Sequence, residues 1–150
     1  GGGGKTPPPP RFCRSLLRHD LSILLPLKDP VRQKNVQETP EEVVRQAMIH
    51  YLSETMGVPL GLMAIEKAVI RHGETKRADI VVHDKQGHAW MVVECKAPSV
   101  PISQRTLEQV SNYNQVLGAP YIFVTNGSTH LCAEIKGDEV LFLESLPEWS

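Results

Sequence analysis

The pattern of hydrophobic and polar positions first becomes regular at Thr39. From there to Gly57, apolar residues recur at helical spacing, which predicts an amphipathic helix. Residues 39–42, Thr-Pro-Glu-Glu, provide an N-cap hydroxyl, a proline at the first helical position and a glutamate at the third, as in a capping box. Gly57 and Pro59 end the helix.

Short apolar runs between turn residues predict strands along the rest of the chain. Before the helix, residues 21–27 and 31–36 flank Lys-Asp-Pro at 28–30 and predict a leading hairpin. After the helix, the expected strands are residues 63–70, 78–83, 89–96, 121–125, 130–135 and 139–143.

A second helix is predicted for residues 103–117, because Gly118 and Pro120 follow it directly. Residues 84–87 are typical of a turn, and Asn126-Gly127 predicts a tight hairpin turn. The segment from 89 to 125 is then a strand–helix–strand crossover, which places its two strands parallel. We therefore expect an α/β fold with a mixed sheet and helices on both faces.

Composition supports one domain without a membrane segment. Residues 1–20 begin with a Gly- and Pro-rich stretch and are expected to be a low-complexity tail, whereas residues 21–150 are expected to form a single domain. No apolar run approaches the roughly 20 residues that span a bilayer. Three widely spaced cysteines argue against a disulfide framework, and together these features predict a cytoplasmic protein.

The charge balance does not indicate nucleic-acid binding. The chain has 16 Lys and Arg against 17 Asp and Glu, for a formal net charge of -1. A dedicated duplex binder usually carries a basic excess, so the total counts against that function. Local patches matter more than the total, and a metal-dependent site must itself hold acidic ligands.

The candidate chemistry lies in residues 92–98, Val-Val-Glu-Cys-Lys-Ala-Pro. Side chains alternate along a strand, so Glu94 and Lys96 project from one face and Cys95 from the other. Asp79 lies in the preceding predicted strand, and pairing of the two strands as a hairpin brings it close to Glu94. Two carboxylates form an oxygen-rich site suited to Mg²⁺ or Mn²⁺. A structural Glu–Lys pair at a strand end is the alternative.

Several segments together resemble the PD-(D/E)xK nuclease superfamily, in particular the N-terminal nuclease domain of type I restriction enzyme R subunits. The resemblance covers roughly residues 30–143. It rests on residues 39–42 with 44–46, 76–82, 93–98, 109–113 and 121–127. It implies a restriction-endonuclease-like core of helix, three strands, helix and strand, followed by C-terminal hairpin strands.

The resemblance also implies roles for individual residues. Asp79 and Glu94 would be metal ligands, with the main-chain carbonyl of Cys95 as a third, and Lys96 would be the catalytic lysine. Gln109 and Tyr113, one helical turn apart, would lie near the substrate backbone. R subunits continue into a DNA-translocating motor that this sequence lacks, so neither translocation nor ATP use is expected.

The first helix contributes further candidates. Glutamates from this helix often reach the metal in the superfamily, and helical phase favours Glu41 over Glu42, which has an ordinary role in the capping box. Arg45 and Arg77 are candidates for binding substrate phosphates. For Glu41 and Arg45, the structural alternative is an ion pair between the two side chains.

The leading functional hypothesis is a Mg²⁺- or Mn²⁺-dependent endonuclease of a restriction or defence system that acts on DNA. The alternative from another class is a nuclease-fold module that binds nucleic acid or a partner protein without cutting. A third hypothesis is a structural domain in which the polar strand residues only form ion pairs with one another. Expected partners are nucleic acid and either a second copy of the chain or the subunits of a restriction complex.

Overall fold

The computed structural model describes residues 28–31, 34–35 and 39–150. Strands β1 (Lys28–Asp29) and β2 (Lys34–Asn35) form an antiparallel pair. The leading hairpin is therefore present, but β1 occupies residues that were expected to form its turn. The expected strand at 21–27 and the expected tail at 1–20 lie outside the described residues.

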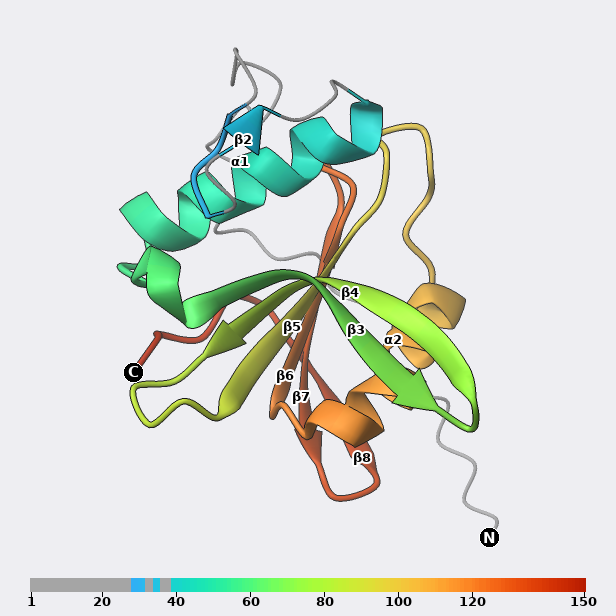
Figure 1. Ribbon diagram of the computed structural model, residues 1–150. Helices are drawn as coiled ribbons and strands as arrows, with labels where there is room; N and C mark the ends of the chain where they lie inside the picture. Colours follow the sequence, from blue (N-terminus) through green and yellow to red (C-terminus); the bar gives the residue numbers. More distant parts are fainter. Residues whose placement is uncertain (1–27, 32–33, 36–38) are drawn as a thin grey trace, which may run out of the picture.

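The main sheet contains six strands in the order β3-β4-β5-β6-β7-β8 (Figure 1). These are β3 (Met63–Arg71), β4 (Glu74–His83), β5 (Ala89–Cys95), β6 (Tyr121–Thr125), β7 (His130–Lys136) and β8 (Glu139–Leu143). Only β5 and β6 pair in parallel among these neighbours, across the predicted crossover. The mixed sheet expected from the order of elements is confirmed.

In the part of the chain that the structure describes, two helices and a short 3₁₀ turn accompany the strands. Helix α1 (Pro40–Glu54) is capped by Thr39, whose hydroxyl accepts the amide of Glu42 at 3.1 Å. Helix α2 (Gln104–Leu117) is capped by Ser103 and ends at Gly118, which adopts a left-handed φ of 69° that glycine tolerates. The 3₁₀ turn η3 (Leu60–Leu62) precedes β3. No described helix is long and apolar enough to cross a membrane.

The sheet separates two apolar layers, because successive strand residues point to opposite faces. Core residues of β5 divide accordingly, with Val93 packing on the α1 side and Val92 on the α2 side. The α1 layer includes Val44, Met48, Ile49, Leu52, Ile80, Met91, Phe123 and Cys132. The α2 layer includes Leu107, Val110, Val81, Ile122, Val124 and Leu131. Both faces of β5 and β6 are thus covered, as expected.

The turn between β6 and β7 occupies the four residues 126–129, as the predicted strand bounds required. Thr125 pairs with His130, and Asn126 and Gly127 lie in the turn as expected. The Asn126 side chain holds the turn together, because its Oδ1 accepts the amides of Ser128 at 3.1 Å and Thr129 at 2.8 Å. Such Asx interactions stabilise a wider loop.

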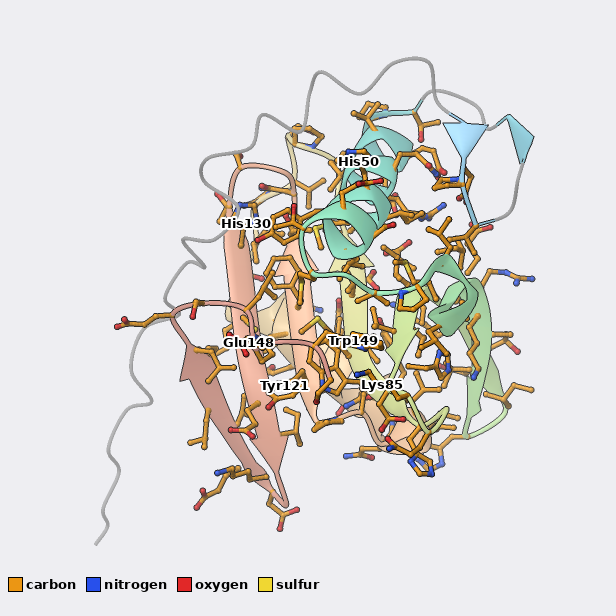
Figure 2. The ribbon with its side chains drawn as sticks, turned by 90° about the vertical axis from the view of Figure 1, so that its left-hand side faces the viewer. His50, Lys85, Tyr121, His130, Glu148 and Trp149 are labelled. Carbon is orange, nitrogen blue, oxygen red and sulfur yellow. The ribbon has the colours of Figure 1, made fainter. Side chains whose placement is uncertain are left out.

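The C-terminal segment packs back onto the α1 layer. Trp149 donates its indole N–H to the His83 carbonyl at 3.0 Å, and the Lys85 ammonium lies 5.5 Å from the centre of its ring (Figure 2). Leu146 joins the same layer. This segment covers the end of the sheet at which β4 turns into β5, leaving the opposite end, with Glu94 and Cys95, for the candidate site.

Candidate functional site

Asp79 lies at an interruption of strand pairing in the middle of β4. On one side Ile80 pairs with Ile65 and Ala78 pairs with Lys67, so Asp79 and Glu66 face each other without forming a ladder pair. Glu66 has a φ of 54°, a conformation that side chains other than glycine rarely adopt. On the other side the ladder with β5 stops at Ile80. Such irregularities redirect side chains, and they are frequent beside functional sites.

The redirected carboxylate of Asp79 is buried and bound at both oxygens. Its Oδ2 accepts the main-chain amide of Cys95 at 2.8 Å, and its Oδ1 accepts Nη2 of Arg45 at 2.7 Å. The first bond fastens Asp79 to the end of β5, and the second fastens it to α1. Three elements therefore fix the position of this carboxylate.

Glu94 lies beside Asp79 and is also buried. Its Oε2 accepts the Tyr113 hydroxyl at 2.8 Å, and its Oε1 lies 3.3 Å from the Lys96 ammonium. Burial, and then the charge of Asp79, raise the pKa of Glu94, while Tyr113 and Lys96 partly offset the rise. The alternation expected from the sequence is confirmed: Glu94 and Lys96 meet, and the Cys95 thiol is buried in the α1 layer.

Arg45 is the centre of the acidic cluster. Its Nη1 pairs with Glu42 and lies 3.6 Å from Glu66, while its Nη2 pairs with Asp79 and lies 3.9 Å from Glu41. The side chain is only 9% exposed, so these contacts are made away from bulk water. Among the described residues, the Nε of Arg45 is a buried donor without a hydrogen-bond partner. The guanidinium is thus crowded with carboxylates at one end and unsatisfied at the other.

The positions of Glu41 and Glu42 reverse the expectation from helical phase. Glu42 is buried, with side-chain exposure of 9%, whereas the Glu41 side chain is 49% exposed. Helical phase failed because α1 is covered on more than one side. Gln46, on the side of α1 away from the sheet, is buried and donates to Glu42 at 2.8 Å and to the buried Asp29 at 2.9 Å. Glu41 still interacts electrostatically with the site, because burial and the charge of Asp79 raise its pKa.

The donor chemistry of the cluster fits a hard divalent cation. Among the described residues, five carboxylates surround Arg45 and Lys96, namely Glu41, Glu42, Glu66, Asp79 and Glu94. Seven ionised groups would carry a formal charge of about -3. Burial raises the pKa of Glu94 most, and the charge of Asp79 raises it further.

The described residues contain no group of three His, Cys, Asp or Glu side chains that could hold a metal ion by themselves. Mg²⁺ does not require one, because it retains several waters and usually takes one or two protein carboxylates. Asp79 and Glu94 would be these two ligands.

The other predicted residues are either buried or exposed. Tyr113 is buried, and burial together with Glu94 raises its pKa, so its hydroxyl remains a donor. Gln109 lies one turn earlier on α2 and is exposed. Arg77 is exposed on β4 and donates to the main-chain carbonyl of Glu66 at 3.3 Å. Burial raises the pKa of the Cys95 thiol well above its usual range, whereas the ligand role of the Cys95 carbonyl stays a prediction.

Glu66 was not anticipated. One signal for it was present: Glu66 and Lys67 are adjacent charged residues inside an otherwise apolar strand, and such a break in alternation is typical of a bulge. Its opposition to Asp79 depends on strand register, which no local pattern encodes.

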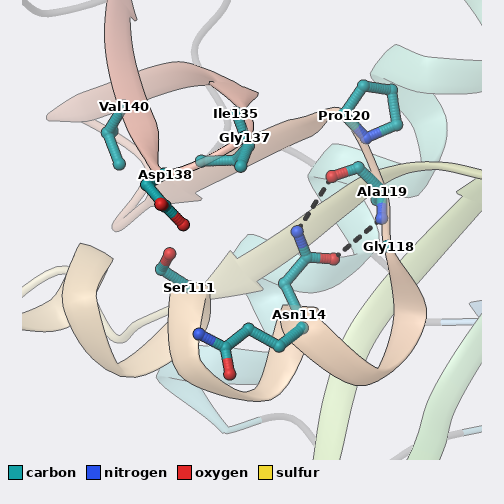
Figure 3. Close-up of a pocket in the computed structure, with 10 residues that line it drawn as sticks. Ser111, Asn114, Gly118, Ala119, Pro120, Ile135, Gly137, Asp138 and Val140 are labelled. Atoms are coloured by element: carbon teal, nitrogen blue, oxygen red, sulfur yellow. Dashed lines mark hydrogen bonds between the residues drawn. The ribbon is translucent and has the colours of Figure 1, made fainter.

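A hollow of about 470 Å³ lies elsewhere, between the end of α2 and the β7–β8 turn (Figure 3). Asn114 closes one side of it through two hydrogen bonds to the Ala119 backbone. Pro120, which lines the hollow, precedes the start of β6, whereas Glu94 pairs near the end of that strand. The hollow is therefore at the opposite end of the sheet from the acidic cluster and contains none of its residues.

Comparisons with known proteins identify the family. Residues 40–147 match the model of a family described as type I restriction enzyme R protein N terminus. A fragment structure of an HsdR subunit of a type I restriction enzyme from Vibrio vulnificus matches with 23% identity and a TM-score of 0.45. The match covers 57% of this chain and 18% of that one, so the matched part is just under a fifth of that chain's length. Comparison with curated proteins found no match. The family model covers most of the chain and confirms the resemblance noted in the sequence: the chain belongs to the type I restriction enzyme R protein N terminus family.

Proposed function

We propose that the chain is a metal-dependent nuclease module of the PD-(D/E)xK type that hydrolyses DNA phosphodiesters as part of a restriction system. The observation that supports this most is the meeting of Asp79, Glu94 and Lys96 at one end of the sheet, with more negative charge than its own cations balance. Membership of the R protein family gives the restriction context. Buried carboxylates placed beside each other are costly without a purpose.

Each side chain has a chemical task in this proposal. Asp79 and Glu94, with the Cys95 carbonyl, hold a Mg²⁺ or Mn²⁺ ion. When bound, the ion lowers the pKa of a water molecule and neutralises charge on the scissile phosphate. Lys96 lies 3.3 Å from Glu94 and is partly exposed, so its ammonium can orient the attacking water and stabilise the charge that develops on phosphate oxygens.

Tyr113, on helix α2, orients one carboxylate of the site. Its hydroxyl donates to Glu94 Oε2 at 2.8 Å, which fixes the orientation of that carboxylate. Gln109 and Arg77 are exposed and remain available to a DNA backbone, whereas Arg45 is buried among carboxylates. We therefore assign substrate contacts to Gln109 and Arg77 in preference to Tyr113 and Arg45.

A cleavage assay on the purified chain tests the proposal. Duplex DNA, single-stranded DNA and RNA are incubated with Mg²⁺, Mn²⁺, Ca²⁺ or excess chelator. DNA should be nicked with Mg²⁺ or Mn²⁺ and not in chelator, and Ca²⁺ should support binding better than turnover.

The variants are Lys96→Ala and Lys136→Ala, a control whose ammonium lies 3.9 Å from Glu134 on an exposed strand end. Lys96→Ala should lose at least about 100-fold in cleavage while keeping DNA affinity, because the lysine acts mainly in the transition state. Lys136→Ala should cut like the wild type. Cleavage that persists in chelator, or in Lys96→Ala at the wild-type rate, would contradict the proposal.

A module that binds nucleic acid without cutting is the second candidate. It is favoured by one observation: both oxygens of Asp79 already accept hydrogen bonds from the protein. Such a module would bind DNA with equal affinity in chelator and in Mg²⁺ and would never cut. The same assay separates the two functions.

A further inference from the structure

We propose that Arg45 pairs with Asp79 in the absence of a metal ion, at the carboxylate that the metal would bind. When a divalent ion binds, Arg45 leaves this carboxylate. The inference rests on the proposed metal site and adds a control of metal affinity to it. It is argued from the different partners of the two terminal nitrogens of Arg45.

The two terminal nitrogens of Arg45 have different partners. Nη1 is held by Glu42, a residue of the same helix, and lies 3.6 Å from Glu66 on β3. Nη2 is held by Asp79 at 2.7 Å. The guanidinium can therefore release Asp79 while Nη1 stays anchored to Glu42, and it need not leave the protein.

Charge explains why the exchange is favourable. A monovalent guanidinium and a divalent ion compete for the same carboxylate, and they repel each other at short range inside a poorly solvated site. The cluster holds five carboxylates, so enough negative charge remains for both cations once they separate. Glu41, which lies 3.9 Å from Nη2, gives the departing end of Arg45 a second carboxylate to approach.

The unsatisfied Nε of Arg45 is a second, independent observation that fits a side chain with two positions. A buried donor without a partner costs free energy, and native proteins seldom retain one without compensation. A guanidinium placed only to stabilise the fold would be expected to satisfy its Nε as well. A side chain that serves two positions need not be fully satisfied in either of them.

The first test compares metal binding in the wild type, Arg45→Gln and the control Arg71→Gln. Arg71 is a β3 arginine bonded to Gln115 at 3.1 Å, away from the cluster. Titration calorimetry with Mn²⁺ should show roughly tenfold tighter binding by Arg45→Gln, because one positive charge is removed beside the ion. Arg71→Gln should bind like the wild type. In thermal melts, Mn²⁺ should raise the melting temperature of Arg45→Gln by more than that of the wild type.

A second measurement does not depend on whether Arg45→Gln folds. In the wild-type chain, the guanidinium resonances of Arg45 are followed by NMR during titration with Mg²⁺, with those of Arg71 as reference. Arg45 signals should shift in step with cation binding, whereas those of Arg71 should not. Arg45 signals that stay fixed at saturating Mg²⁺ would overturn the exchange.

The outcomes separate this inference from the proposed function. If the wild type binds Mn²⁺ and Arg45→Gln binds equally or more weakly, Arg45 positions Asp79 and does not compete with the ion, so the exchange is wrong while the metal site stands. If neither protein binds Mn²⁺, both the exchange and the proposed function are wrong. Tighter binding by Arg45→Gln, lost again in Arg45→Gln with Glu94→Gln, supports both.

Discussion

The hydroxyl of Tyr113 donates a 2.8 Å hydrogen bond to Glu94, joining the middle of α2 to the end of β5. Both residues are buried, so the bond is protected from water. Lys76 extends the contact outward, since its ammonium lies 5.7 Å from the centre of the Tyr113 ring. A helix on one face of the sheet thus sets the orientation of a carboxylate that we assign to the metal site.

Tyr113→Phe should remove this bond while keeping the ring in the α2 layer. The hydrogen bond lowers the pKa of Glu94, so its loss should make the carboxylate harder to ionise and less well oriented. We expect a loss of stability of about 1–2 kcal/mol and Mn²⁺ affinity about tenfold weaker. Urea unfolding and calorimetric titration measure the two effects. Metal affinity equal to that of the wild type would contradict the assigned role.

Glu94→Gln should stabilise the metal-free chain. Burial and Asp79 raise the pKa of Glu94, so its ionised form costs stability above the folded-state pKa. We expect the variant to melt a few degrees higher than the wild type at neutral pH in chelator, with the gain shrinking as the pH falls through that pKa. Mn²⁺ should raise the melting temperature of the wild type and not of the variant. A variant that melts lower in chelator would mean that Glu94 is held mainly by its partners.

His130 should give the chain a separate sensitivity to acid. It is buried, its Nδ1 contacts the Thr125 hydroxyl at 2.7 Å, and burial lowers its pKa from 6.5 to about 4. The folded state therefore favours the neutral ring, so stability present above pH 6.5 should be lost as the pH falls toward 4. The loss should reach about 3 kcal/mol.

The measurement is the free energy of unfolding of the wild type and of His130→Gln between pH 7 and pH 4. Their difference should change by that amount, because all other titrating groups are shared. Parallel curves for the two proteins would show that His130 does not titrate in this range.

The elements of the fold were largely predictable, because periodicity and capping act locally. The strands at 121–125 and 139–143 have the predicted bounds, and Thr39 and Gly118 mark the helix ends as expected. The proximity of Asp79 and Glu94 followed from treating their strands as a hairpin, which is an argument about neighbours in sequence.

The inner arrangement of the site was less predictable, since it depends on contacts between distant segments. Arg45 was expected at a substrate or in an ion pair with Glu41. It does lie 3.9 Å from Glu41, but its side chain is buried and also pairs with Asp79, 34 residues later in the chain. Helical phase placed Glu41 inward, but the β1–β2 segment bonds to Gln46 and buries a face that the phase argument treated as outer. The opposition of Glu66 and Asp79 likewise follows from strand register.

The central claim is that Asp79 and Glu94 share one divalent cation, and diffraction from crystals grown with Mn²⁺ tests it most directly. Anomalous data collected near the manganese absorption edge locate the ion without reference to activity. The account predicts one strong peak about 2.0–2.3 Å from a carboxylate oxygen of Asp79 and from one of Glu94. No such peak should occur in Glu94→Gln crystals grown in the same way. A fully occupied Mn²⁺ at another position, with Arg45 still paired to Asp79 and no peak between the two carboxylates, would contradict it.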